Sequence, residues 1–331
     1  MRAAAAAVIG LACAACGSAG HTAPARAARP AGLLRWPVYR HELRPLDLAG
    51  PTGNGTLVLA AGGRLFTLDR SGQTSLFSAA YDRPGNTEPY IAAPAPGHRG
   101  CSFGRHAVYA LRLYGSRGVV KVIRHGPVRQ FARLTAPGLI NGIAFDETGR
   151  FGHRLLVTIN AGLRTMVVAI GCRGRVRTVT RDAPRVEGGI AVAPARFGRF
   201  GGQLVAPDEK SGKIYAIGRR GRVTLLVRSG LSFGQDVGVE SEVFVPRRAP
   251  RYQVLGADRR SPGNPHPGDD ALLRIGSAAL GRAGVRPGDL LIGTEGGARL
   301  IAVRCRSVCR AHEVAAGPAG AHLEGHLGLL P

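Results

Sequence analysis

The stretch EGGIAVAP at residues 187–194, followed by GRFGGQLVAP at 198–207, is the part of the sequence that decides the fold. Its first half alternates apolar residues with small or polar ones, as expected for a half-buried β-strand. A close copy of the second half, GRFGHRLLVT at 149–158, lies 49 residues earlier. Self-similarity at a period of this size is typical of a repeat architecture.

The same strand pattern recurs along the chain at intervals of about 50 residues. Each copy is followed by short strands separated by glycine- and arginine-bearing turns. A unit therefore holds about four antiparallel strands, which we call A to D, and radial repetition of such sheets produces a β-propeller. The other copies of the A strand are EPYIAAP at 88–94, INGIAFDE at 140–147, ESEVFVP at 240–246 and EGHLGLLP at 324–331.

We predict an all-β fold, a single six-bladed β-propeller over residues 51–331. The last eight residues read as an A strand, whereas GTLVLAAGGRLFTLDRSGQTSLFS at 55–78 supplies three strands without an A strand before them. Joined, they make one blade, so we expect the C-terminal strand to pair with the N-terminal blade and close the ring. The pattern is weakest around 276–311, where a helical turn is expected at 276–285.

The composition is that of a globular, turn-rich and strongly basic protein. Its 331 residues include 49 Gly and 22 Pro, aromatic residues make up 5%, and the formal net charge is +24. Nearly all basic residues are arginines, scattered without a run of five like charges. We interpret this charge as general adhesiveness toward anionic surfaces rather than as a site. The scarcity of aromatic residues argues against specific nucleic-acid binding.

Residues 1–16 have the features of an export signal. Arg2 precedes thirteen apolar residues, too few to span a bilayer, and the ending Ala-Ala-Cys16-Gly17 resembles a bacterial lipobox. We therefore predict a lipidated Cys16 and a tether and lead-in over 17–50, which would anchor a monomer to the outer side of the cell membrane. Cys13 stands where that motif prefers an aliphatic residue, so simple secretion is the alternative.

Export would place the remaining four cysteines in an oxidising compartment, where an even number favours disulfides. Cys101 and Cys172 are expected on the same face of neighbouring blades, so a bond between them is geometrically reasonable. Cys305 and Cys309 would close a hairpin. A zinc site is disfavoured because Cys101 and Cys172 lie far apart in the sequence.

Acidic residues are expected to surround one mouth of the propeller channel, because the D–A and B–C loops of antiparallel blades share one face. Converging carboxylates need a cation, raised pKa values or arginine partners such as Arg185. Since the set offers oxygen ligands without Cys or His, we predict a divalent metal, with Ca²⁺ preferred. The predicted metal ligands are Glu88, Asn141, Glu187, Glu240 and Glu324.

Further polar residues of this face are candidates for contact with a ligand, which we expect to be a small molecule, a glycan or a protein. Glu209 and Glu295 fall in B–C turns, and His322 lies two residues before Glu324. The insertion SPGNPHPGDD at 261–270 is either a lid over the mouth or a long surface loop. The candidate ligand contacts are Asp208, Asp236, Asp258 and His326.

A serine hydrolase is disfavoured although GLSFG at 230–234 matches G-x-S-x-G. That motif works on a sharp strand-to-helix turn, whereas Ser232 would lie in a loop between antiparallel blades. No catalytic residue is assigned from the sequence.

The six-unit arrangement and NGIAFDETG at 141–149 resemble the calcium-dependent six-bladed propellers of the gluconolactonase and senescence-marker class. This resemblance implies one divalent metal at the channel mouth and hydrolysis of lactones or related esters. By match, Asn141 would be the Asn ligand, Glu187 would replace an Asp, and Glu88 or Glu324 would be the Glu ligand. The sequence also resembles the non-enzymatic TolB-like and NHL-type propellers.

Two functions follow from these expectations. The first is an exported or surface-anchored propeller whose acidic, metal-binding mouth binds a ligand or partner. The alternative is a calcium-dependent hydrolase of a small lactone or ester, in which the metal polarises the carbonyl group.

Overall fold

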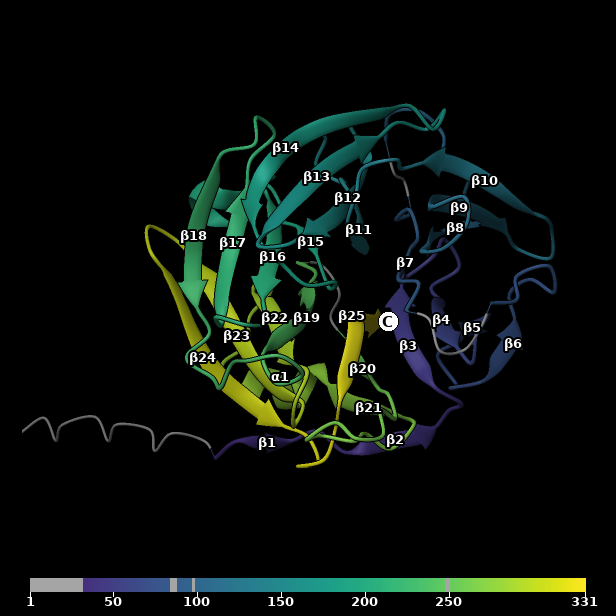
Figure 1. Cartoon of the computed structure of the whole chain (residues 1–331). Coiled ribbons are helices and arrows are strands. Elements are labelled where there is room, and N and C mark those ends of the chain that lie inside the picture. Colours follow the sequence, from purple (N-terminus) through teal and green to yellow (C-terminus); the bar gives the residue numbers. More distant parts are fainter. Residues whose placement is uncertain (1–31, 84–87, 97–98, 248–250) are drawn as a thin grey trace, which may run out of the picture. The chain divides into compact units, whose positions relative to one another are not determined.

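A computed structural model describes residues 32–83, 88–96, 99–247 and 251–331. Six β-sheets follow one another around a common axis (Figure 1). The prediction of an all-β, six-bladed propeller is confirmed. The predicted export signal, the lipidation site Cys16 and the tether up to residue 31 lie outside the described residues.

Four blades are simple meanders of consecutive strands, each with its first strand nearest the axis. Blade 1 holds β3 (Pro45–Ala49), β4 (Leu57–Ala61), β5 (Arg64–Leu68) and β6 (Thr74–Leu76). Blade 2 holds β7 (Ile91–Ala92), β8 (Ala107–Arg112), β9 (Gly118–Ile123) and β10 (Val128–Arg133). Blade 3 holds β11 (Leu139–Phe145), β12 (Leu155–Ala161), β13 (Arg164–Ile170) and β14 (Val176–Pro184). Blade 4 holds β15 (Ala191–Val192), β16 (Leu204–Asp208), β17 (Lys213–Ile217) and β18 (Val223–Arg228), with the 3-10 turn η1 (Gly198–Phe200) between β15 and β16.

The last two blades are interleaved in the sequence. Blade 5 holds β19 (Val239–Phe244), β22 (Leu290–Thr294), β23 (Arg299–Cys305) and β24 (Cys309–Ala316), with β1 (Leu34–Arg35) added in parallel to β24. Between β19 and β22 the chain forms β20 (Gln253–Asp258), β21 (Ala271–Gly276) and the short helix α1 (Ser277–Arg282). Blade 6 combines β20 and β21 with β25 (Leu323–Leu330) at the axis and β2 (Val38–His41) at the rim.

The ring is closed through both ends of the described chain, as expected, because β2 and β25 share blade 6. The strand that β25 pairs with differs from the expected one. It is β20, where Leu255 stands opposite Gly328, whereas β4 pairs with β3. The segment 45–49, expected to belong to the lead-in, is instead the A strand of blade 1, with all five residues buried.

The segment that precedes blade 1 is therefore part of the propeller, which begins by Leu34 rather than at residue 51. Trp36, between β1 and β2, is 1% exposed and packs in the apolar core of blades 5 and 6. A side-chain carbon on Gly256 would lie 3.0 Å from this indole, so the glycine in β20 makes room for it. Burying a large aromatic ring in this way fixes the lead-in to the last two blades.

Two disulfides form as the cysteine pattern predicts. Cys101 is joined to Cys172, which links the A–B loop of blade 2 to the C–D turn of blade 3. Cys305 is joined to Cys309 across the β23–β24 hairpin. The helical turn expected near 276–285 is α1, and no helix among the described residues is long and apolar enough to cross a membrane.

Candidate functional site

The innermost strands approach one another closely at one mouth of the channel because the sequence supplies glycines there. A Cβ atom on Gly188 would collide with the ring of Tyr90, and one on Gly189 would collide with the backbone of Glu240 and Gly325. These two glycines belong to the EGGIAVAP motif of blade 4. The motif therefore lets the innermost strands of different blades bring their acidic side chains together.

Tyr90 occupies the centre of this acidic group. Its hydroxyl lies 2.6 Å from Oε1 of Glu240 and 2.8 Å from Oε2 of Glu324. A phenol carries one proton, so it donates to one carboxylate and needs a protonated carboxyl group to supply the second hydrogen bond. Burial, followed by the charge of Glu324, raises the pKa of Glu240 well above its ordinary value, which identifies Glu240 as a group that keeps a proton.

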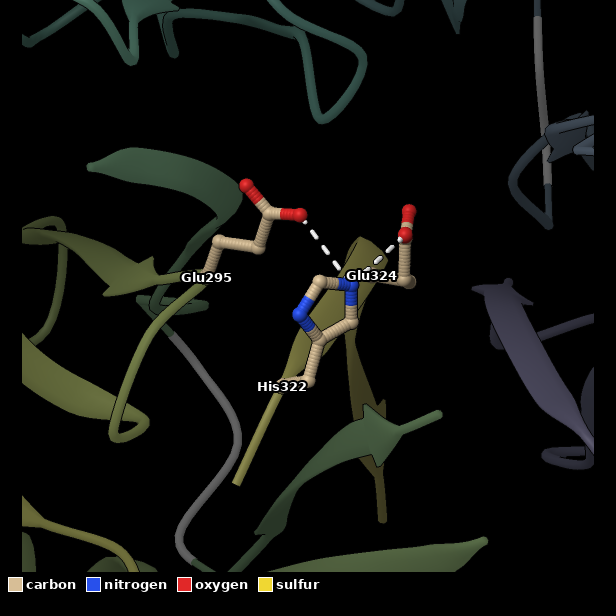
Figure 2. Close-up of side chains that lie close together, drawn as sticks. All are labelled: Glu295, His322 and Glu324. Carbon is tan, nitrogen blue, oxygen red and sulfur yellow. Dashed lines mark hydrogen bonds and ion pairs between the residues drawn. The ribbon is translucent and has the colours of Figure 1, made fainter. Parts of the chain in front are cut away.

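His322 lies between two further carboxyl groups, as Figure 2 shows. Its Nε2 atom is 3.1 Å from Oε1 of Glu295 and 3.2 Å from Oε1 of Glu324. Glu295 is the residue directly after β22. Glu324 lies at the start of β25, and His322 is the residue directly before that strand. Ligand atoms of these three buried residues all lie within 4.8 Å of one another, the spacing that a metal ion requires.

The other ring nitrogen of His322 has no hydrogen-bond partner among the residues that the structure describes, although the residue is 2% exposed. Its backbone N–H donates to Oδ1 of Asp258 at 2.8 Å. Asp258, predicted to contact a ligand, thus lies behind His322 and positions it. Burial raises the pKa of the Asp258 carboxyl, and its second oxygen also lacks a partner in the described part of the chain.

A second group of carboxylates shares Glu295 with the first. Ligand atoms of Glu209, Asp236 and Glu295 also lie within 4.8 Å of one another. The backbone N–H of Asp236 donates to Oε1 of Glu209, which holds the D–A loop against the B–C turn of blade 4. Burial raises the pKa of both Glu209 and Glu295, and in Glu295 the charge of Glu324 adds to this effect. Asp236 is thus at the mouth, as expected.

Arg259 brings the main positive charge near this cluster. Its guanidinium forms an ion pair with Glu88 and lies 3.7 Å from Oε1 of Glu324. The charge of Glu324 and then burial raise the pKa of Glu88, while Arg259 opposes the shift. Glu88 is therefore neutralised by an arginine at the edge of the mouth. The sequence suggested such a role for Arg185 but not for Arg259.

Asn141 and Glu187, the residues matched to the family motif, lie away from His322 and bind each other. The amide of Asn141 donates to the Val186 carbonyl at 2.9 Å and to Glu187 at 3.2 Å, and its Oδ1 accepts from Thr158. Arg185 forms an ion pair of 3.1 Å with Glu187. Burial raises the pKa of Glu187 in spite of this arginine. Their polar atoms are thus already engaged within the protein.

The remaining candidates have structural roles. Asp208 caps its own B–C turn by accepting from the Lys210 N–H at 3.2 Å and from the Ser211 hydroxyl. His326 lies on β25 in the channel wall, where its Nδ1 is 2.9 Å from Oδ1 of Asp47. Burial lowers the pKa of His326, but the Asp47 carboxylate outweighs this effect and the net pKa is raised. The importance of Asp47 was missed because it lies in the segment assigned to a lead-in.

The insertion at 261–270 folds against the mouth. The Gly268 N–H donates to the Gly320 carbonyl at 2.8 Å, and His266 Nδ1 lies 2.7 Å from the Ala319 carbonyl. A Cβ on Gly296, next to Glu295, would lie 2.5 Å from the His266 ring. This loop therefore forms one side of the mouth, next to Glu295.

No protein-family model matches the sequence, and no curated protein matches it either. Among solved structures, regucalcin from Agrobacterium tumefaciens, titled a calcium-binding protein, is 11% identical with a TM-score of 0.50, covering 86% of this chain and 80% of its own. A streptogramin B lyase is 10% identical with a TM-score of 0.47, covering 88% and 92%. A putative TolB from Agrobacterium tumefaciens is 12% identical with a TM-score of 0.47, covering 87% and 90%. Likeness at such low identity concerns the fold alone, and in its fold the chain is a six-bladed β-propeller.

Proposed function

We propose that the protein is an exported or surface-anchored β-propeller that holds a divalent cation on Glu295, His322 and Glu324 and binds a ligand or partner at that channel mouth. The observation that carries the proposal is the buried group of three donor atoms within 4.8 Å of one another. The two disulfides support an oxidising compartment outside the cytoplasm.

The spacing of the three side chains fits a metal ion. Ligand atoms bound to one ion through bonds of about 2.1 Å lie about 3.0 Å apart at right angles and about 3.4 Å apart at the tetrahedral angle. The separations of 3.1 and 3.2 Å from His322 to the two carboxylates agree with this geometry.

The charge of the mouth also favours a cation. Burial and then the charge of Glu324 raise the pKa of both Glu240 and Glu295, and the Arg259 guanidinium faces Glu324. A divalent ion bound at the mouth would stabilise the ionised carboxylates and so displace the protons that Glu240 and Glu295 retain. Binding would therefore release protons and stabilise the folded protein.

The donor set suggests which ion. Ca²⁺ was predicted from oxygen ligands alone, and the oxygen-only group of Glu209, Asp236 and Glu295 suits it. Glu295, His322 and Glu324 include an imidazole nitrogen, which suits Zn²⁺ or another first-row ion better. We therefore propose a Zn²⁺-type ion at His322, which would offer an open coordination position to a ligand oxygen from a peptide, glycan or small molecule.

Calorimetric titration of chelator-treated protein with ZnCl₂, MnCl₂ and CaCl₂ tests the site. We expect one equivalent of Zn²⁺ to bind, with affinity reduced at least about tenfold in Glu295→Gln and His322→Gln because each removes one ligand. Glu313→Gln is the matched control, since Glu313 pairs with Arg299 at 2.6 Å on the outer strands of blade 5. Absence of binding, or binding that the two site variants leave unchanged, would reject the proposal.

Hydrolysis of a small lactone or ester is the second candidate function. The observation that favours it is the Tyr90 hydroxyl, which shares a proton with Glu240 immediately beside Glu324. A bound cation would supply Lewis-acid polarisation of a carbonyl. Tyr90 and Glu240 would keep a proton close to the leaving oxygen. Turnover of lactones and aryl esters that is lost with chelator and in Tyr90→Phe would support it, and metal binding without turnover would leave the binding function.

A further inference from the structure

Nine arginines gather on the face opposite the acidic mouth, over blades 3 and 4. Eight of them belong to the A–B loops and C–D turns of these two blades and Arg177 to the start of β14, whereas the acidic residues occupy the starts of A strands and the D–A and B–C loops. Eight are exposed, and Arg154 is half-buried. The nine are Arg150, Arg154, Arg173, Arg175, Arg177, Arg199, Arg219, Arg220 and Arg222.

These arginines line three adjoining hollows. The first, of about 510 Å³, and the second, of about 540 Å³, share Arg150 and Arg219. The second and the third, of about 620 Å³, share Arg154 and Arg177. The Cys101–Cys172 disulfide lies in the wall of the third. The hollows therefore form one continuous row with guanidinium groups in every shared wall.

No acidic side chain neutralises this row in the described part of the chain. None of the nine arginines takes part in a recorded ion pair, and residues 148–181 and 196–207 contain no Asp or Glu. Two acidic residues precede Arg150 in its loop. Asp146 is fully buried and accepts hydrogen bonds from the backbone of Phe151, at 2.7 Å, and of His153, at 3.0 Å, whereas the exposed Glu147 accepts from the backbone N–H of Ala95 at 3.0 Å. The positive charge of the row is therefore available to an anion.

The row is built by the sequence repeat. GRFG occurs at 149–152 and again at 198–201, which places Arg150 and Arg199 at equivalent positions of neighbouring blades. AIGCRGRV at 169–176 and AIGRRGRV at 216–223 do the same for the C–D turns. Part of the row is held in place, because the stem of Arg150 packs against Gly202 and the guanidinium of Arg199 lies 4.9 Å from the centre of the Phe200 ring.

We infer that this row, which we call the arginine face, binds a linear polymer that carries phosphate groups. Guanidinium groups bind phosphate oxygens bidentately, and unneutralised arginines in three successive hollows suit an anion that repeats along a chain. This interaction is independent of the function proposed for the acidic mouth.

The arginine face lacks the features that nucleic acids and membranes usually require of a binding surface. Phe151 and Phe200 are buried, so no aromatic ring in the hollows is exposed for stacking on nucleic-acid bases. Val176 is the one large apolar side chain of the hollows that is strongly exposed, whereas peripheral membrane binding usually inserts several. A phosphate polymer needs neither feature.

Binding of long-chain inorganic polyphosphate to the full chain, measured in parallel with orthophosphate and with phosphatidylglycerol vesicles, tests the inference. We expect affinity to rise with chain length and to fall with added salt, since counterions screen such contacts. Tight binding of orthophosphate without chain-length dependence would reveal a free-phosphate pocket instead. Binding to vesicles but not to polyphosphate would indicate a lipid surface, and either result overturns the inference.

A charge-matched pair of variants separates the arginine face from the general charge of the protein. Arg150, Arg177 and Arg219 changed together to Gln should weaken polyphosphate binding at least about tenfold. The control changes Arg129, Arg133 and Arg228 to Gln, which are exposed on β10 and β18 outside the hollows. Equal weakening in both would overturn the inference. The melting temperature checks folding, and the same three positions changed to Lys should restore part of the affinity.

Discussion

Asp47 and His326 lie 279 positions apart in the sequence and are joined by a hydrogen bond of 2.9 Å between the Asp47 carboxylate and Nδ1 of the imidazole. The same carboxylate accepts from the backbone N–H groups of Leu48, Ile91 and His326. One buried side chain of blade 1 thus binds the innermost strands of blades 2 and 6.

Asp47→Ala should be strongly destabilising, because it leaves three backbone donors and one imidazole without an acceptor. We expect a loss of about 3 kcal/mol or more, seen as a fall of about 5 °C or more in melting temperature. Asp182→Asn is the control, since Asp182 is exposed. A melting temperature close to that of the wild type would show that water replaces the carboxylate.

Glu242→Gln should stabilise the protein in a pH-dependent way. Glu242 is 1% exposed, neither oxygen has a partner among the described residues, and burial raises its pKa well above 4.5, opposed only weakly by the Ala191 backbone. Because the folded-state pKa is the higher one, the contribution of Glu242 to the stability of the wild type is most favourable below about pH 4.5 and declines as pH rises.

The neutral amide removes this decline, so the gain in melting temperature should be larger at pH 8 than at pH 4.5. The melting temperatures of the wild type and of Glu242→Gln, measured over this pH range with a chelator present to remove cations, test this prediction. An identical gain at both values would mean that Glu242 does not titrate with folding.

Arg259→Gln should strengthen cation binding at the mouth while weakening the metal-free protein. It removes a positive charge 3.7 Å from Glu324 and the partner of Glu88. We expect Zn²⁺ affinity to rise about tenfold as this repulsion disappears. If Arg259 instead neutralises the cluster in place of a metal, the substitution lowers stability and Zn²⁺ fails to restore it.

Tyr90→Phe should destabilise the mouth by about 1–3 kcal/mol, because Glu240 and Glu324 lose the hydroxyl group to which both are hydrogen-bonded. The loss should shrink on addition of Zn²⁺, which draws Glu324 into coordination. Thermal unfolding with and without the ion measures both effects. Tyr215→Phe is the control, since its half-buried ring lies on β17, away from the mouth.

The repeat was enough to predict the blades, because alternating strands and glycine turns are local properties of the chain. The partner of β25 was not predictable in this way. β20 and β21 interrupt blade 5 in the sequence, and only the assembled ring shows that they belong with Leu323–Leu330. The A strand of blade 1 escaped notice because PLDLA at 45–49 contains a charged residue at a fully buried position.

The acidic mouth was predictable as a region, since strand starts converge by symmetry, but its contacts were not. Residue spacing indicated that Glu240 and Glu324 share a face, while the approach of Glu295 to His322 depends on loops of different blades. The arginines of the opposite face could not be grouped from the sequence either. They are dispersed along the sequence, yet folding gathers nine of them on two neighbouring blades.

The interleaving of blades 5 and 6 has a consequence for biogenesis. Val38–His41, near the start of the chain, and Leu323–Leu330, near its end, belong to the same sheet. During synthesis, the first four sheets can assemble as they emerge from the ribosome, whereas the sixth must wait for Leu323–Leu330. Until then Gln253–Asp258 lacks its axial neighbour and exposes an unpaired edge, which would invite association with other nascent chains.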